Sequence, residues 1–418
     1  MISIDTDAAA SGGNRRSPGF QFVASAFVLL LGLFGSHLAT PLYPIWQAEF
    51  GLSTGAITLI YACYPIGVTG GLLFGGRLGD QVGRKPLILS GLLLMIGSAA
   101  IYLVATGMPA LVAARLLNGV AIGLLSGPAV ALIVELHPQQ NRSEGSRIGA
   151  LATLASPAVG LLAATMIVYF AHSTDMAVTF PFILQIAGIM VGIMLLTTVR
   201  ETILPENKVR WRDASFAPQG LHIPAGIRSG FLFAALIGVL AWANTGLWLS
   251  LGPSLVYEVL GSHNRLLGGL MVVAFLTTAG VVQLFTRGME FPRAITLGLA
   301  LVIPSIVLVN VMLVWHSAIG LAVGVALAGA SQGLSWMGCS QLINHIAPSR
   351  YRASVVSALY ICGYFGSSIP VIATGAAADA IGLFPALLLL SALFVGLAIY
   401  LIITNVRINR AGFAPPAA

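Results

Sequence analysis

Long apolar runs separated by short polar segments fill almost the whole chain. Runs of about 18 or more apolar residues can cross a bilayer. Backbone polar groups in lipid must find partners within their own segment or in a closed barrel, and these runs lack the short alternating segments of barrel strands. The pattern predicts an all-α membrane protein with about twelve transmembrane helices, near residues 20–43, 53–77, 86–106, 109–137, 146–171, 177–199, 229–257, 265–286, 293–314, 317–346, 352–378 and 383–405.

The composition of the 418-residue chain agrees with this prediction. Only 8% of the residues are charged and 57% are hydrophobic, whereas soluble proteins carry about 25% charged residues. The mean hydropathy is +0.94. A chain of this composition has too little polar surface to face water on all sides, so an ordinary soluble fold is excluded.

The net charge of +7 suits a nucleic-acid partner at first sight, but the positions of the basic residues argue otherwise. Lys and Arg gather before the first predicted span and after the even-numbered spans, whereas the segments after spans one, three, five, nine and eleven hold none. This alternation follows the positive-inside rule. It predicts a multi-pass protein of the bacterial cytoplasmic (inner) membrane, with both termini in the cytoplasm and no nucleic-acid partner.

A polar segment divides the chain into two halves that repeat each other about 210 positions apart. The matched positions are Arg77 and Asp80 with Arg287 and Glu290, Gly119 and Gly123 with Gly329 and Gly333, and Pro138 and Arg142 with Pro348 and Arg352. One register at three separate places indicates a duplication. We expect two pseudo-symmetric bundles with these boundaries: a disordered cytoplasmic segment at 1–19, a six-helix bundle at 20–199, a cytoplasmic loop at 200–228, a six-helix bundle at 229–405 and a cytoplasmic tail at 406–418.

Two short motifs carry a resemblance to a known family. The run GRLGDQVGRK at 76–85 resembles the loop motif of the major facilitator superfamily, G-x-x-x-D-[RK]-x-G-R-[RK], with Gln81 in place of the usual Arg or Lys. Arg115 followed by Gly119 resembles a second motif of that family. A third motif, of the drug–proton antiporter branch with 12 helices, is matched only in part, by Pro157 and Gly160. The resemblance covers nearly the whole chain and implies a transporter.

The charged residues of the first motif form a predicted gate. We place Asp80 just past the second span, near the start of a loop, and the resemblance implies that it contacts a helix end in the other half and locks the outward-facing state. A carboxylate gains roughly 0.3–1 kcal/mol at a helix N-terminus. Arg84 and Lys85 are predicted to pair with Glu135 or Glu144, or else only to anchor the topology. The predicted gating residues are Gly76, Asp80, Gly83, Arg84, Lys85, Glu135 and Arg142.

Arg115 lies two turns inside the fourth predicted span, and an intramembrane charge indicates a functional site. It either tunes the proton affinity of a nearby acid or pairs with an anionic substrate; snorkelling to the surface is the alternative. No acid lies at mid-depth in any predicted span. The candidate proton carriers are therefore Glu135 and His37, because His titrates near neutral pH, although His37 is otherwise explained as a buried structural residue.

Aromatic and amide side chains recur in the spans that line the central cavity of the resembled family. Such a cavity suits an amphipathic organic solute, although any single aromatic side chain is also explained by packing. The residues predicted to line the path of substrate or protons are His37, Arg115, Asn118, Trp242, Asn244, Trp248, Gln332, Trp336, Tyr360 and Tyr364.

No phosphate-binding loop, catalytic motif or metal-ligand spacing occurs in the chain, so we expect neither an enzyme nor a cofactor or metal. Cys63, Cys339 and Cys362 fall in apolar segments and are expected to be free thiols. The prediction is a secondary active transporter with alternating access that couples protons to the efflux of small amphipathic compounds such as drugs or metabolites. The alternative is a proton symporter that imports an organic anion or nutrient. We expect a monomer in the lipid bilayer whose partners are a small-molecule substrate and protons.

Overall fold

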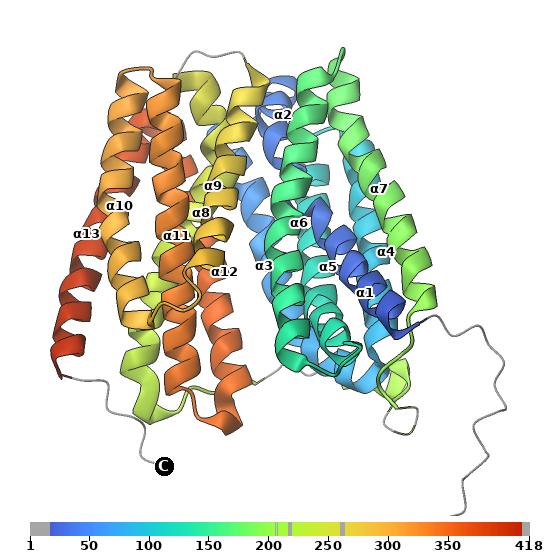
Figure 1. Cartoon of the computed structure of the whole chain (residues 1–418). Coiled ribbons are helices and arrows are strands. Elements are labelled where there is room, and N and C mark those ends of the chain that lie inside the picture. Colours follow the sequence, from blue (N-terminus) through green and yellow to red (C-terminus); the bar gives the residue numbers. More distant parts are fainter. Residues whose placement is uncertain (1–16, 205, 207, 216–219, 260–263, 412–418) are drawn as a thin grey trace, which may run out of the picture.

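The computed structural model describes residues 17–204, 206, 208–215, 220–259 and 264–411, and every regular element in these ranges is a helix (Figure 1). Twelve helical segments are long and apolar enough to cross a membrane. The predicted fold class is therefore confirmed. Residues 1–16 and 412–418, within the predicted terminal segments, lie outside the described residues.

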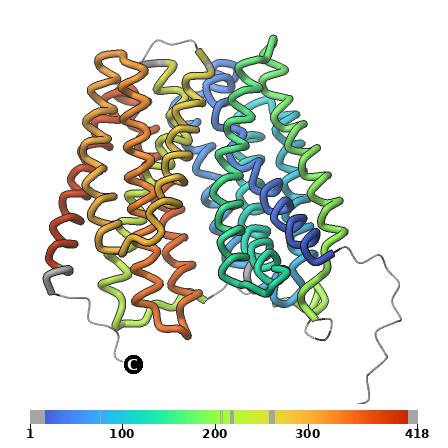
Figure 2. The backbone as a smooth tube through the Cα atoms, viewed as in Figure 1, coloured from blue at the N-terminus to red at the C-terminus, as the bar shows by residue number. Residues whose placement is uncertain are grey.

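The long helices form two bundles joined by a linker (Figure 2). The first contains α1 (Pro18–Phe34), α2 (Tyr43–Phe50), α3 (Thr54–Val82), α4 (Arg84–Leu103), α5 (Met108–Glu135), α6 (Arg142–Phe170) and α7 (Thr174–Thr198). The second contains α8 (Arg228–Val259), α9 (Arg265–Phe285), α10 (Phe291–Val314), α11 (Ala318–Ile346), α12 (Arg352–Ile381) and α13 (Leu383–Ala411). We call the end of the molecule where the linker runs the linker side; it is at the bottom of Figure 1.

The first span, predicted from the sequence near residues 20–43, is interrupted in the structure. α1 ends at Phe34, α2 begins at Tyr43, and two short 3-10 turns occupy part of residues 35–42. Pro41 and Pro44 lack the backbone N–H that a continuous helix requires, which accounts for the interruption. Irregular backbone at membrane depth is tolerated where protein covers it, and this segment is buried.

The connection between the second and third spans is shorter than predicted. α3 continues to Val82 and α4 begins at Arg84, so the connection is a single residue, Gly83, with φ of +107°. Glycine adopts this backbone conformation without the steric cost that a Cβ imposes. Asp80, predicted just past the span at the start of a loop, therefore lies in the last turn of α3.

Glycines allow α5 to lie directly against α3. A Cβ on Gly119 would lie 2.2 Å from the carbonyl oxygen of Tyr64, and a Cβ on Gly123 would lie 2.5 Å from that of Val68. Gly127, the next glycine in the four-residue repeat, has no atom within 4 Å of its Cβ position. Only part of the repeat therefore serves helix packing.

The second bundle repeats this arrangement between α11 and α9. A Cβ on Gly329 would lie 2.4 Å from the carbonyl oxygen of Phe275, and a Cβ on Gly333 would lie 2.5 Å from that of Ala279. The glycines that match in sequence at a spacing of about 210 thus occupy equivalent packing positions, whereas Asp80 lies in α3 and its match Glu290 precedes α10.

The contrast between Gly119 and Gly127 yields a stability prediction. Gly119→Ala forces α5 away from α3, and overpacking of this kind costs about 1–3 kcal/mol. Gly127→Ala meets open space and gains the helix propensity of Ala, so we expect no loss of stability. Thermal unfolding of the detergent-solubilised variants measures the difference. Equal melting temperatures for Gly119→Ala and the parent would contradict the packing.

Candidate functional site

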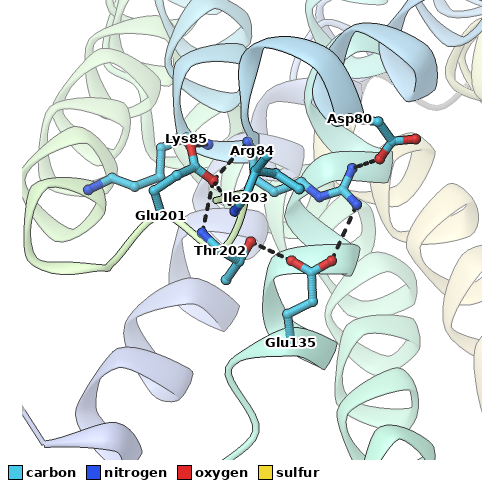
Figure 3. Close-up of polar contacts among 7 residues, drawn as sticks. All are labelled: Asp80, Arg84, Lys85, Glu135, Glu201, Thr202 and Ile203. Carbon is cyan, nitrogen blue, oxygen red and sulfur yellow. Dashed lines mark hydrogen bonds and ion pairs between the residues drawn. The ribbon is translucent and has the colours of Figure 1, made fainter. Parts of the chain in front are cut away.

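Arg84 connects the ends of three segments on the linker side (Figure 3). Its Nη1 lies 2.6 Å from Oδ1 of Asp80, and its Nη2 lies 3.3 Å from Oε1 of Glu135. The Arg84 side chain is 13% exposed, whereas that of Asp80 is 65% exposed. The structure therefore brings together three of the predicted gating residues, with Arg84 at the centre and Asp80 open to solvent.

Glu201, at the start of the linker, completes this cluster. Its carboxylate accepts hydrogen bonds from the backbone N–H groups of Arg84 (3.0 Å) and Lys85 (3.2 Å). These two groups form the N-terminus of α4, where the helix dipole favours a negative charge. Lys208 Nζ lies 3.4 Å from the same carboxylate. The linker is thus attached to the charged motif through one acidic side chain.

The surroundings of Glu201 favour its ionised form. Burial by itself raises the pKa of the carboxyl group, but backbone N–H donors from Ile203, Arg84 and Thr202 and the charge of Lys208 lower it, and the net pKa is below the ordinary value. The hydroxyl of Thr202 also donates a hydrogen bond to Glu135 (Figure 3). The linker therefore contacts the Arg84 cluster at two places: Glu201 binds the backbone of Arg84, and Thr202 binds the carboxylate of Glu135.

Gln81, the residue that departs from the motif, holds the linker by neutral hydrogen bonds. Its backbone carbonyl accepts a hydrogen bond from Val209 N at 2.8 Å, and its Oε1 accepts one from Ser215 N at 2.9 Å. An Arg or Lys side chain has no acceptor atom and would not receive the second bond. Gly83 is equally constrained, because a Cβ there would lie 2.5 Å from Oε2 of Glu201.

Among the described residues, no hydrogen bond or ion pair joins the rest of the predicted gate to the side chains of Asp80, Arg84 and Glu135. Lys85 Nζ donates a hydrogen bond to the carbonyl of Val199 at the end of the sixth span. Gly76 lies within α3. Arg142 is the exposed first residue of α6, and it has no ion pair among the described residues.

Glu144, the alternative partner of Arg84, is engaged elsewhere. Its carboxylate lies 3.5 Å from Nε2 of His137 and 3.7 Å from Nη2 of Arg147. Of the two acids considered from the sequence, Arg84 therefore pairs with Glu135.

Arg115 is 1% exposed and is held by neutral groups. Its Nε donates to the hydroxyl of Tyr43 at 2.8 Å, and its Nη1 donates to the carbonyl of Ser36 at 2.9 Å. Its guanidinium carbon also lies 5.9 and 5.3 Å from the ring centroids of Tyr61 and Tyr64, within the range of cation–π attraction. No carboxylate of the described residues pairs with it, so Arg115 stabilises the interrupted first span.

Two other predicted path residues are buried in the first bundle. His37 is 8% exposed, lies in the interrupted segment with its ring 5.7 Å from that of Tyr64, and has no partner for Nδ1. Asn118 is 1% exposed; its Nδ2 contacts the sulfur of Met95 at 3.6 Å, and its Oδ1 has no partner. Neither side chain faces an open path in this conformation.

Four of the predicted aromatic residues form one cluster of edge-to-face rings. The Trp242 ring lies 5.1 Å from that of Trp336 and 4.7 Å from that of Tyr364, and Trp336 lies 5.1 Å from Tyr360. The cluster joins α8, α11 and α12, and Tyr364 also packs against the core of the first bundle. Tyr360 is 38% exposed, and the buried Nε1 of Trp242 has no acceptor. An apolar wall with one free donor is suited to an aromatic or amphipathic ligand.

The other predicted path residues of the second bundle lie inside that bundle. Trp248 is 2% exposed and packs near Phe275. Asn244 donates to the carbonyl of Ala328 at 3.4 Å and, with Gln332, lines a small cavity enclosed by α8, α10, α11 and α13. The structure therefore separates these three residues from the aromatic cluster.

Direct side-chain contacts between the bundles gather on the side opposite the linker. Ser53 and Gly55 bond to Asp379 there, and Val371 of α12 shares a buried cluster with Tyr61 of α3. In Figure 1 the two bundles meet toward the top and diverge toward the linker side. No group of three or more metal-ligating side chains occurs in the described part of the chain.

The sequence analysis missed Glu201 and Tyr43, which carry the two main polar clusters. Glu201 is one of three acids in the linker, with Glu206 and Asp213, so its charge did not single it out, and its position directly after the sixth span was the available signal. Tyr43 gave no signal, because its role depends on the interruption of the first span.

The lowered pKa of Glu201 predicts a pH dependence of stability. A carboxyl group with a depressed pKa in the folded state stabilises the protein above its unfolded pKa, and this contribution is lost as the pH falls through the folded value. Glu201→Gln is therefore expected to lower the melting temperature at pH 7, with a difference from the parent that shrinks below about pH 4.5. Thermal unfolding between pH 3 and 8 measures this. Glu206→Gln, an exposed linker acid, is the control and should show no such convergence.

Two bacterial relatives match part of the chain. Over 206 residues the chain is 26% identical to the uncharacterized MFS-type transporter EfpA of Mycobacterium tuberculosis, covering 48% of this chain and 37% of that protein. Over 122 residues it is 25% identical to the quinolone resistance protein NorA of Staphylococcus aureus, covering 28% of this chain and 31% of that protein. The matches thus span about a third of the length of these relatives.

Solved structures share the fold over nearly the whole chain. A bacterial homologue of the human lysosomal transporter Spinster, in an inward-facing and unoccupied conformation, has a TM-score of 0.74 at 13% identity and covers 97% of this chain and 100% of that one. A D-xylose–proton symporter has a TM-score of 0.72 at 16% identity, with coverage of 92% and 97%. The sequence model described as Major Facilitator Superfamily matches residues 25–370. The chain therefore belongs to the Major Facilitator Superfamily of membrane transporters.

Proposed function

We propose that this transporter exports small amphipathic organic compounds from the cytoplasm in exchange for protons, by alternating access. The observation that carries the proposal is the aromatic cluster of Trp242, Trp336, Tyr360 and Tyr364, which lies beside the first bundle and includes a free indole donor. Aromatic walls with few polar groups bind varied flat or amphipathic solutes. The similarity to the quinolone resistance protein supports export over import.

We propose that the linker side faces the cytoplasm, in accord with the basic residues on that side. The contacts between the bundles then close the outer side, and the separation of the bundles corresponds to an inward-open state. In this scheme the two moving bodies are the bundles expected at residues 20–199 and 229–405. The helix ends at Thr198 and Arg228 are in accord with these boundaries. Each bundle moves as one body about the substrate path.

The protons move through groups that titrate in the path, and His37 and Glu135 are the proposed carriers. Glu135 is exposed and paired with Arg84 on the inner side. His37 is buried beside Tyr64, which lies in the outer half of α3, and has a free ring nitrogen. We place Glu135 at the inner entrance of the proton path and His37 deeper within it.

A second candidate function is the import of an organic anion with protons. The specific observation is Arg115, a buried cation without a carboxylate partner among the described residues. An uncompensated buried charge is costly, and an opposite charge beside it reduces this cost. In this alternative the substrate carboxylate replaces the Tyr43 hydroxyl as the partner of Arg115.

A vesicle assay separates the two candidates. Inside-out proteoliposomes with an acidic lumen are expected to accumulate the fluorescent dye ethidium, and collapse of the pH gradient should release it. In right-side-out proteoliposomes with an acidic exterior, proton-driven uptake of radiolabelled benzoate, without dye transport in the inside-out vesicles, would favour the anion importer. Trp336→Ala is expected to raise the KM for the dye about tenfold, because an aromatic contact contributes roughly 0.5–1.5 kcal/mol beyond its buried area. Trp315→Ala, at a 72% exposed position, is the matched control and should leave the KM unchanged.

Asp80 is proposed to close the inner side when the outer side opens. In this structure it is exposed and bonded only to Arg84 among the described ion pairs. Asp80→Asn is expected to insert normally and to lower the transport rate at least tenfold, because the carboxylate charge stabilises the closed inner side. Asp213→Asn, an exposed acid of the linker, serves as the control. Normal dye transport by Asp80→Asn would remove Asp80 from the gate.

A further inference from the structure

Asp379 reaches from the last turn of α12 to the first turn of α3 in the other bundle. Its Oδ2 accepts a hydrogen bond from the hydroxyl of Ser53 at 2.7 Å, and both carboxylate oxygens lie 3.1 Å from the backbone nitrogen of Gly55. Ser53 is the N-cap residue of α3. One side chain of the second bundle thus occupies the N-terminus of a helix in the first.

The location of Asp379 is unfavourable within its own helix. α12 ends at Ile381, and the carbonyl groups at the C-terminus of a helix repel a negative charge. The N-terminus of α3 attracts the same charge, and the bond from Ser53 is charge-assisted. The carboxylate at position 379 is therefore stabilised by the other bundle and by nothing in its own last turn.

The two helices are fitted closely around this contact. A Cβ on Gly375 would lie 2.0 Å from Oγ1 of Thr58, and a Cβ on Gly55 would lie 2.5 Å from Oδ2 of Asp379. Gly375 is therefore required for the present approach of α3 and α12, and Gly55 leaves room for the Asp379 carboxylate. The Asp379 contact is itself exposed at the edge of this interface, and the close approach of the helices beside it fixes its position.

The contacts along α3 and α12 show that the pair is antiparallel. Asp379 lies at Ser53, Gly375 lies at Thr58, and Tyr364 packs against the cluster that contains Tyr64. Continued to the linker side, this register sets Asp80 level with the first residues of α12, near Arg352. Each helix of the pair thus carries an aspartate in its last turn; in this structure Asp379 contacts its partner helix, whereas Asp80 bonds to Arg84.

We propose that Asp379 is a positioning residue for transport: its bonds to Ser53 and Gly55 hold the outer side closed while the path is open to the cytoplasm. The inference rests on the alternating access of the proposed function, but not on the substrate or the coupling ion. When the outer side opens, the Asp379 contact breaks and Asp80 gains the corresponding contact at the other end of the same helix pair.

A distance measurement between the bundles tests the proposal without a transport assay. Spin labels on cysteines at Val104 and Trp315, which are 74% and 72% exposed on the outer side of the two bundles, report the opening of that side by pulsed electron paramagnetic resonance. The native cysteines Cys63, Cys339 and Cys362 are replaced by Ala in the full-length background. The measured quantity is the ratio of the population with a long distance between the two labels to the population with a short one.

Asp379→Asn is expected to raise this ratio three- to tenfold above that of the parent. Asp379→Glu is expected to raise it less, because the negative charge remains. Gly55→Ala gives an independent test, since it displaces the carboxylate without a change of charge and should shift the ratio in the same direction. Gly70→Ala in the same helix meets open space and is the matched control for it.

Asp175→Asn removes an exposed acid from the first turn of α7 on the same outer side and controls for net charge. A parent-like ratio for both Asp379→Asn and Gly55→Ala would overturn the proposal. An equal shift for Asp175→Asn would overturn it as well, because net charge would then explain the effect. If neither ethidium nor benzoate is transported but the ratio shifts as expected, only the proposed substrates are wrong and the role of Asp379 stands.

Discussion

The two bundles meet along two helix pairs, α3 with α12 and α6 with α9, and the first pair holds the charged contact on which the proposed closure of the outer side depends. Near one end Gly375 allows the helices to touch, and Asp379 binds the N-terminus of α3. The bundles are joined at this end and diverge at the other. Within each bundle, glycines allow α5 to lie directly against α3 and α11 against α9.

The first span shows how a charge is accommodated at membrane depth without an opposite charge. The interruption after α1 frees the carbonyl of Ser36 and brings the hydroxyl of Tyr43 to the guanidinium of Arg115. These neutral acceptors, with the faces of Tyr61 and Tyr64, replace the carboxylate that a buried cation usually requires. Arg115 and the irregular backbone therefore stabilise each other, since the guanidinium and the oxygen atoms of Ser36 and Tyr43 form hydrogen bonds that lipid cannot supply.

On the linker side the charged motif serves two purposes at once. Arg84 pairs with Asp80 and Glu135, while its backbone N–H and that of Lys85 bind Glu201. The linker is thereby fixed to the first bundle next to the proposed gate. The linker and the charged motif therefore share the N-terminus of α4.

The sequence by itself determined the class of the molecule, because apolar runs of membrane length permit only helices, and it determined the number of spans and the glycine positions of the duplication. It also identified Arg84 and Glu135, whose charges are conspicuous in so apolar a chain. Tertiary structure decided the rest. The one-residue connection at Gly83, the interruption before Tyr43, and the contact of Asp379 with Ser53 join residues whose local sequence gives no sign of a partner. Hydropathy measures the affinity of a segment for lipid, whereas these contacts depend on how helices distant in the chain come to lie against each other.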